Sequence, residues 1–128
     1  MFFFSSDPNL SSYSFGQKKR PAFISDFDLY IESATQSQII ELYNKSSIFI
    51  STSREEGFGL TGLESMACRC ALVSTKTNCI KDDANSENAI LCDIDDIDDI
   101  YNALVDLLND NDKRISIAKK GNLNCSDI

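Results

Sequence analysis

One stretch of the chain decides its fold, and it reads Glu56-Gly57-Phe58-Gly59-Leu60-Thr61-Gly62-Leu63-Glu64. The short apolar run Ile48–Ser51 lies before it, and residues 65–68 continue it. Glycine permits tight turns and close approaches of the backbone that other side chains would block. We therefore expect a buried strand, a glycine-bearing turn and a helix that begins at Leu60.

The same stretch has the groups needed to hold a polar, phosphate-bearing ligand. If Leu60 begins a helix, the N–H groups of residues 57–60 lack intrahelical partners and can bind phosphate or sugar oxygens. Glu56 faces the same pocket, and Glu64 lies one helical turn further on. A carboxylate can accept hydrogen bonds from two neighbouring hydroxyls, as in a sugar. The alternative is a simple turn with two solvated glutamates.

Regular elements surround this stretch. Thr35 and Gln38 match a capping box, which predicts a helix over residues 36–45. Apolar runs at 71–74 and 89–92 predict two further strands. Asp96 can cap a helix with an apolar stripe from Ile97 to Leu108. This order predicts an α/β fold in which crossover helices link parallel strands.

The two ends of the chain are less regular. Residues 1–34 predict an irregular lead-in with one or two short strands, at 22–24 and 29–31. At the other end, Asp112 can cap a last helix that Gly121 ends. The division is therefore a lead-in over 1–34 and a folded unit over 35–128.

Composition excludes several classes of protein. The 128 residues are 42% hydrophobic and 25% charged, which is typical of a soluble globular domain. No apolar run approaches the roughly 20 residues that span a bilayer, and the first residues lack the features of a secretory signal. A net charge of −8 argues against nucleic-acid binding. We expect a cytoplasmic protein, with a peripheral position at the inner membrane face left open.

Metal and nucleophile sites are not expected. The acidic run over 93–99 is interpreted as a solvated helix start, because it has regular isoleucines and no glycine turn of a calcium loop. The five cysteines form no C-x-x-C pair and are expected to be packed thiols. The chain has no histidine, which excludes Ser-His-Asp and Cys-His catalysis within it.

Residues 51–66, and less closely 43–121, resemble the C-terminal donor-binding domain of GT-B retaining glycosyltransferases of the group 1, or family four, type. The family pattern E-G-F-G-L-x-x-L-E-x-M-A-x-G-x-P corresponds to residues 56–71. The resemblance implies a Rossmann-like parallel sheet with flanking helices, and it makes residues 35–128 part of a nucleotide-sugar-binding domain.

The resemblance also implies roles for the residues of the motif. Glu56 would be the catalytic residue, touching hydroxyls of the transferred sugar, and Glu64 would hold the nucleotide ribose. Donor contacts would come from the backbone of Gly57, Phe58, Gly59 and Leu60. Such enzymes transfer a hexosyl group from a nucleotide-diphosphate sugar to a glycan or lipid-linked acceptor in polysaccharide or lipopolysaccharide biosynthesis, with no metal and no further cofactor.

The chain departs from the family pattern in two ways. Arg69 and Ala71 replace the usual Gly and Pro, and residues 77–79 replace a Gly-Gly loop. The resemblance covers only the latter half or so of the donor domain, so we expect a truncated glycosyltransferase. A non-catalytic remnant, or a subunit that needs a separate chain for the acceptor domain, is the second hypothesis. An unrelated flavodoxin-like binding module is the third.

Overall fold

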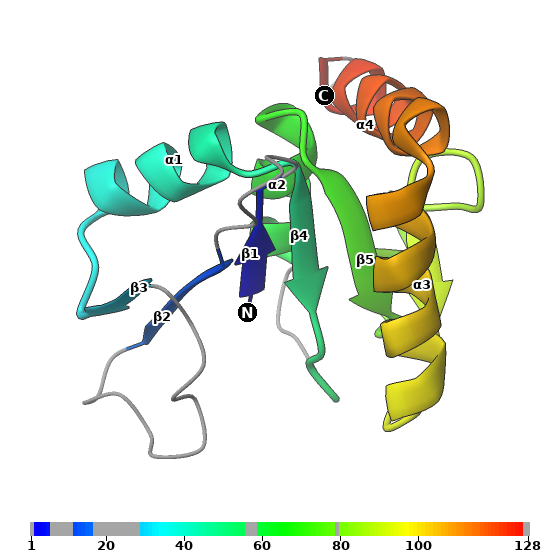
Figure 1. Cartoon of the computed structure of the whole chain (residues 1–128), viewed down its shortest axis with the longest axis horizontal. Helices are drawn as coiled ribbons and strands as arrows, with labels where there is room; N and C mark the ends of the chain where they lie inside the picture. The colour runs from blue at the N-terminus through cyan, green and yellow to red at the C-terminus, as the bar shows by residue number, and fades with distance from the viewer. Residues whose placement is uncertain (1, 6–11, 17–28, 56–58, 79, 127–128) are drawn as a thin grey trace.

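The computed structural model describes residues 2–5, 12–16, 29–55, 59–78 and 80–126 (Figure 1). Its strands are β1 (Phe2–Phe4), β2 (Ser12–Gly16), β3 (Leu29–Glu32), β4 (Ile48–Ser51), β5 (Ala71–Thr75) and β6 (Ile90–Cys92). Its helices are α1 (Gln36–Lys45), α2 (Leu60–Ala67), α3 (Ile97–Asn109) and α4 (Asn111–Ser126), with a short 3-10 helix, η1 (Ile80–Asp82).

The strands form one sheet in the order β3-β2-β1-β4-β5-β6. Strands β4, β5 and β6 are parallel, with Ile48 opposite Ala71 and Val73 opposite Ile90. Helix α2 makes the crossover between β4 and β5, as a parallel pair requires. The expected α/β fold, a parallel sheet with flanking helices, is therefore confirmed.

The first part of the sheet differs from the sequence prediction. The described residues up to Glu32 form three strands, whereas one or two were predicted. The predicted strand at 29–31 is confirmed as β3, and the run at 22–24 lies outside the described residues. Strand β1 is antiparallel to both β2 and β4, while β2 and β3 are parallel. Residues 5–11 are too few for the crossover of a dozen or more residues that a parallel β1–β2 pair would need.

Two hydrophobic cores cover the two faces of the sheet. Phe49 and Leu72 belong to one core, together with residues of α1 and α2. Ile50 and Val73 belong to the other, where Leu107 of α3 packs. Successive strand residues thus alternate between two buried faces, which explains why β4 and β5 are continuous apolar runs without polar alternation.

The predicted start of α1 is confirmed. The Thr35 hydroxyl accepts a hydrogen bond from the Gln38 N–H at 3.3 Å, and Gln38 Oε1 accepts one from the Thr35 N–H at 2.9 Å. This reciprocal pair is a capping box, and it satisfies two N–H groups that the helix itself leaves free.

The predicted limits of the last helix are wrong. Asp110, not Asp112, caps α4, because its Oδ1 accepts from the Lys113 N–H at 2.9 Å. Gly121 lies inside the helix rather than at its end. A Cβ at this position would lie 3.3 Å from Asn88 O and 3.3 Å from Met66 Cε, so the glycine serves close packing of α4 on its neighbours.

Four of the five cysteines lie in the described residues and are packed free thiols, as predicted. Cys70 and Cys92 are fully buried, Cys68 and Cys125 are half-buried, and all four are free thiols. Cys79 lies outside the described residues. Burial raises the pKa of Cys70 to about 12, so this thiol stays protonated at neutral pH.

Candidate functional site

The polar groups of interest gather at one edge of the sheet. Strands β4, β5 and β6 are parallel, so their carboxyl ends, at Ser51, Thr75 and Cys92, lie at the same edge. The segments that follow are residues 52–55, 76–78 and 93–96. In open α/β sheets, ligands bind outside this edge of the strands.

Helix α2 begins at this edge with an open N-terminus. Gly59 precedes it with φ 63° and ψ 21°, in the left-handed region that glycine adopts without strain. No side chain of the described residues caps this helix, and its first turn contains no acidic residue. A helix N-terminus of this kind presents N–H groups without intrahelical partners and the positive end of the helix dipole.

Glu64 lies one turn into α2 and is half-buried. Its Oε2 accepts a hydrogen bond from the Tyr43 hydroxyl of α1 at 3.2 Å. The same hydroxyl lies 3.1 Å from the carbonyl oxygen of Thr61, in the first turn of α2. Burial, followed by the charge of Glu64, raises the pKa of Tyr43 well above its ordinary value, so the phenol remains a donor.

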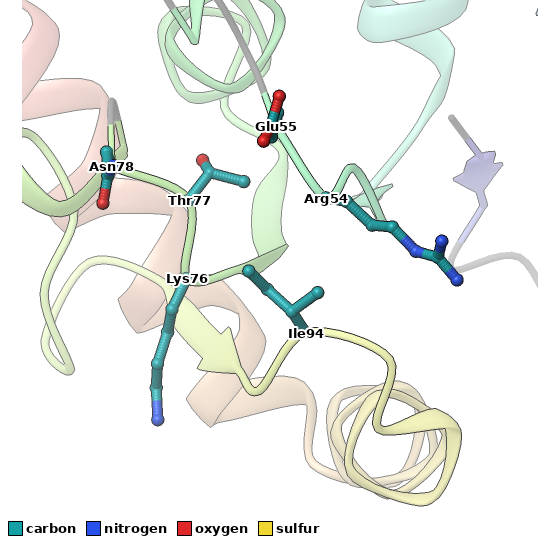
Figure 2. A pocket seen from close by; sticks show the side chains of 6 residues that line it. All are labelled: Arg54, Glu55, Lys76, Thr77, Asn78 and Ile94. Carbon is teal, nitrogen blue, oxygen red and sulfur yellow. The ribbon is translucent and has the colours of Figure 1, made fainter.

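A pocket of about 330 Å³ opens between the three segments at the carboxyl edge (Figure 2). Ile94 provides its apolar part, and Figure 2 shows the Arg54 and Lys76 side chains extending away from each other. The pocket is lined by Arg54, Glu55, Lys76, Thr77, Asn78 and Ile94.

Hydrogen bonds and ion pairs join these segments. Thr75 Oγ1 donates to the Ser53 carbonyl oxygen at 2.5 Å, which ties the end of β5 to the segment after β4. Arg54 pairs with Asp95 at 2.8 Å, and Lys76 pairs with Asp93 at 2.8 Å. Asp93 raises the pKa of Lys76. Both cations are exposed, so these pairs orient the segments more than they stabilise the fold.

Thr77 has a buried hydroxyl without a hydrogen-bond partner among the described residues. Its side chain is 3% exposed, and its Oγ1 makes no hydrogen bond to any described residue. A buried hydroxyl left unpaired destabilises a protein by about 1–3 kcal/mol. This group lies in the segment after β5, beside the pocket.

The acidic run begins α3, as the sequence predicted. Asp96 Oδ1 accepts from the Asp99 N–H at 3.0 Å, and Asp99 Oδ2 accepts from the Asp93 N–H at 3.1 Å. The three carboxylates are close enough to approach one metal ion, but all three are exposed. Their hydrogen bonds are those of a helix cap, and the expectation of no metal stays a prediction.

The structure places only part of the predicted site. Gly59, Leu60 and Glu64 lie at the start of α2, whereas Glu56, Gly57 and Phe58 lie outside the described residues. The Leu60 side chain is 59% exposed, so its backbone N–H is the group that this residue brings to the helix start.

Sequence reasoning missed Tyr43, which contacts α2, and Lys76, which lines the pocket, and it noted Thr77 only as part of a departure from the family pattern. The rule that ligands bind at the carboxyl ends of parallel strands could have indicated residues 76–78. The link from Tyr43 to Glu64 joins positions 21 residues apart and carries no local signal.

A model of the family "Glycosyl transferases group 1" matches residues 28–123, about three quarters of the chain. The chain belongs to the group 1 glycosyl transferases. No curated protein matches this group 1 chain in sequence. In the described part of the chain, no helix is both long enough and apolar enough to cross a membrane.

Solved structures resemble the chain over most of its length. The C-terminal domain of a group 1 glycosyl transferase (LpcC) from Francisella tularensis matches 77% of the chain with 29% identity and a TM-score of 0.68. Sucrose-phosphate synthase from Thermosynechococcus elongatus matches 77% with 19% identity and a TM-score of 0.71. HepE from Anabaena, solved in complex with UDP, matches 79% with 20% identity and a TM-score of 0.69.

The chain spans about half or less of the length of these proteins. The match covers 52% of the Francisella domain, 25% of the synthase and 27% of HepE. The two more distant likenesses show the fold alone. Together the matches place the chain within the Rossmann-like C-terminal domain of GT-B glycosyltransferases.

Proposed function

We propose that this chain forms one wall of the donor site of a retaining glycosyltransferase of the family four type. The donor is a nucleotide-diphosphate sugar, and a hexosyl group passes to a glycan or lipid-linked acceptor in polysaccharide or lipopolysaccharide biosynthesis in the cytoplasm. One observation carries the proposal: helix α2 begins after Gly59 with no side-chain cap from the described residues, at the carboxyl edge of the parallel strands, and Glu64 lies one turn away.

Each group at this edge suits one part of the donor. The N–H groups of the first turn of α2 suit the diphosphate, because they combine unpaired donors with the positive end of the helix dipole. The carboxylate of Glu64 suits the two ribose hydroxyls, from which it can accept hydrogen bonds together. Glu56, from the same motif, contacts the hydroxyls of the transferred sugar and acts in catalysis.

The leaving diphosphate is stabilised without a metal ion in this proposal. Backbone N–H groups that are already oriented toward the developing charge can lower the barrier to transfer. No additional cofactor is needed, because the nucleotide sugar supplies both the sugar and its leaving group.

The electrostatics of the chain suggest that its own wall binds weakly. Arg54 and Lys76 are the cations at the pocket, but each pairs with an aspartate. The chain has a net charge of −8, which opposes the approach of a diphosphate. We therefore propose that further parts of the enzyme, or a partner chain with the acceptor domain, complete the charge around the donor.

Calorimetric titration with UDP, ADP and GDP tests the proposal. One of these should bind, and Glu64→Ala should weaken its binding about tenfold or more, since hydrogen bonds to a charged group are lost. Glu87→Ala is the matched control, because Glu87 is exposed and far along the chain from α2. Equal effects of the two substitutions, or no binding of any nucleotide, would contradict the proposal for this chain.

A sugar-transfer assay separates the enzyme from the non-catalytic alternative. If the chain binds a nucleotide but hydrolyses or transfers no sugar, either alone or with a chain bearing an acceptor domain, it is a binding remnant. Transfer that depends on Glu56 and continues in EDTA supports the metal-independent enzyme.

A further inference from the structure

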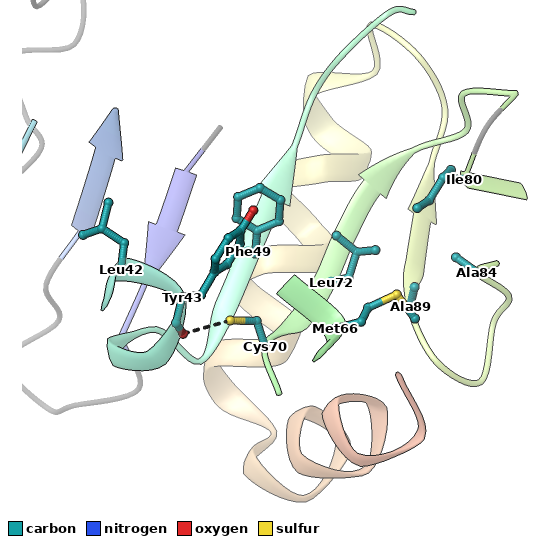
Figure 3. Close-up of a cluster of buried hydrophobic side chains, with 9 residues drawn as sticks. All are labelled: Leu42, Tyr43, Phe49, Met66, Cys70, Leu72, Ile80, Ala84 and Ala89. Carbon is teal, nitrogen blue, oxygen red and sulfur yellow. Dashed lines mark hydrogen bonds between the residues drawn. The ribbon is translucent and has the colours of Figure 1, made fainter. Parts of the chain in front are cut away.

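Tyr43 is a buried side chain that reaches from one helix to the next. It lies near the end of α1 and is 1% exposed. Its ring meets the edge of Phe49 of β4 at a centroid distance of 5.4 Å and an interplanar angle of 62°. Cys70 Sγ donates to its carbonyl oxygen at 3.2 Å (Figure 3). The ring and the backbone of Tyr43 are thus held by different parts of the core.

The hydroxyl of this fixed ring contacts α2 at two points. It lies 3.1 Å from the Thr61 carbonyl oxygen and 3.2 Å from Glu64 Oε2. Residues 61 and 64 are three apart, so both acceptors lie on one face of α2. A phenol has a single O–H, so these two acceptors in α2 share one donated proton, and the carboxylate is the stronger acceptor of the two.

Packing alone does not explain a tyrosine at this place. A phenylalanine would fill the same volume without bringing a polar group into the core. The Thr61 and Glu64 acceptors of this hydroxyl both belong to α2, and an O–H donor suits a carboxylate oxygen. The hydrogen bond to Glu64 engages Oε2, and no other side chain of the described residues donates to this carboxylate.

We infer that Tyr43 is a positioning residue for nucleotide binding, whose hydroxyl fixes the Glu64 carboxylate so that its second oxygen meets the ribose hydroxyls. This inference rests on the proposed function, because it concerns the same donor site. A carboxylate that is already oriented loses less side-chain freedom when the ligand binds. Tyr43 touches no reacting atom in this arrangement and acts through Glu64.

Tyr43→Phe tests the inference, because it removes the hydroxyl and keeps the ring. Binding of a nucleoside diphosphate should weaken about fivefold to tenfold, because the ligand must then immobilise a Glu64 side chain that the hydroxyl no longer orients. The preference for the ribonucleotide over the 2′-deoxyribonucleotide should fall by a similar factor. A purely structural role for the tyrosine would lower the melting temperature without changing this preference.

Ser65→Ala is the matched control. The Ser65 hydroxyl is also fully buried in α2, and it donates to the Gly62 carbonyl oxygen at 2.7 Å. Its hydrogen bond is to the backbone and not to the Glu64 carboxylate. Its removal should change stability but leave the ribose preference as it is in the unmodified chain. All titrations are made at a temperature where circular dichroism shows the variants folded.

Glu64→Gln provides a second test of the positioning role of Tyr43. With Tyr43 present, the amide oxygen of the substituted side chain faces the hydroxyl, and its NH₂ group faces the ligand. Without the hydroxyl the amide can turn, so Tyr43→Phe should cost no further affinity in the Glu64→Gln background. Independent effects of the two substitutions would overturn the inference.

The outcomes separate the inference from the proposed function. If Glu64→Ala removes binding but Tyr43→Phe changes neither affinity nor ribose preference, only the positioning role is wrong. If Glu64→Ala has no effect, or no nucleotide binds, both the site and the role of Tyr43 are overturned.

Discussion

Two helices begin at the same edge of the sheet, and they begin differently. Helix α3 follows β6 and is closed by its own side chains, with Asp96 as its cap and Asp98 and Asp99 in its first turn. Helix α2 follows β4 with Gly59 before it, no capping side chain among the described residues and no acid in its first turn. Among the described residues, the start of α3 is thus satisfied by side chains, whereas the start of α2 has no side-chain cap.

The largest expected contrast comes from changing the residue that precedes each helix. Gly59→Ala should destabilise the fold by about 1–2 kcal/mol, because alanine is strained at a φ of 63°. It should also weaken nucleotide binding. Asp96→Ala should lower stability by about 1 kcal/mol through loss of its cap, with no effect on binding. Urea unfolding measures the stability of the two variants, and calorimetry measures their affinity for the nucleotide. Equal losses of nucleotide affinity in the two variants would contradict the predicted difference between the helix starts.

The unpaired hydroxyl at the pocket should give an effect of opposite sign. Thr77→Val keeps the shape of the side chain and removes the buried Oγ1 that bonds to no described residue. The free chain should therefore become more stable by about 1 kcal/mol. Thermal unfolding measures this gain, and a loss of stability would show that the hydroxyl is already satisfied.

A negative charge placed before α2 should make its N-terminus similar to that of α3, which begins with acidic residues. Gly59→Asp and Gly59→Asn have similar shapes and both tolerate the left-handed region, so their difference isolates charge. The aspartate variant should bind a nucleoside diphosphate about threefold more weakly than the asparagine variant, because its charge competes for the helix dipole. Equal affinities in low-salt titrations would indicate that the diphosphate binds elsewhere.

The smallest expected effect is seen only in alkali, and it concerns the buried thiols Cys70 and Cys92. Cys70 has an ordinary pKa of 9.0 that burial raises to about 12, and the pKa of Cys92 rises to about 11 through burial and then Asp99. The unfolded thiols ionise first, so stability is full below pH 9 and falls as pH rises toward 11–12. Melting temperatures in mildly to strongly alkaline buffers should fall less steeply in Cys70→Ala than in Cys92→Ala. The reverse order would contradict this assignment.

Local signals in the sequence predicted the parallel half of the fold well. The capping box at Thr35, the apolar runs of β4 and β5 and the Asp96 cap of α3 each depend on neighbouring residues. The pairing of β1 with β4 joins distant segments, so no short pattern could reveal it. Gly121 carries the usual signal of a helix end, but its close contact with Met66 is tertiary and outweighs that signal.

The candidate site also has a part that the sequence predicted and a part that depends on tertiary packing. Gly59 and Glu64 belong to a continuous motif, and the sequence indicated both of them. The contact between Tyr43 and Glu64, and the buried hydroxyl of Thr77, depend on how separate elements pack. Glu56, Gly57 and Phe58 lie outside the described residues, and their roles stay predictions from the motif.

The most direct test of the central claim is an NMR titration of the ¹⁵N-labelled chain with a nucleoside diphosphate. The largest amide shifts should occur at residues 59–62, where α2 begins open, with little change at residues 97–100, where α3 begins closed. Shifts centred on the start of α3, or no saturable shift at the start of α2, would contradict the account.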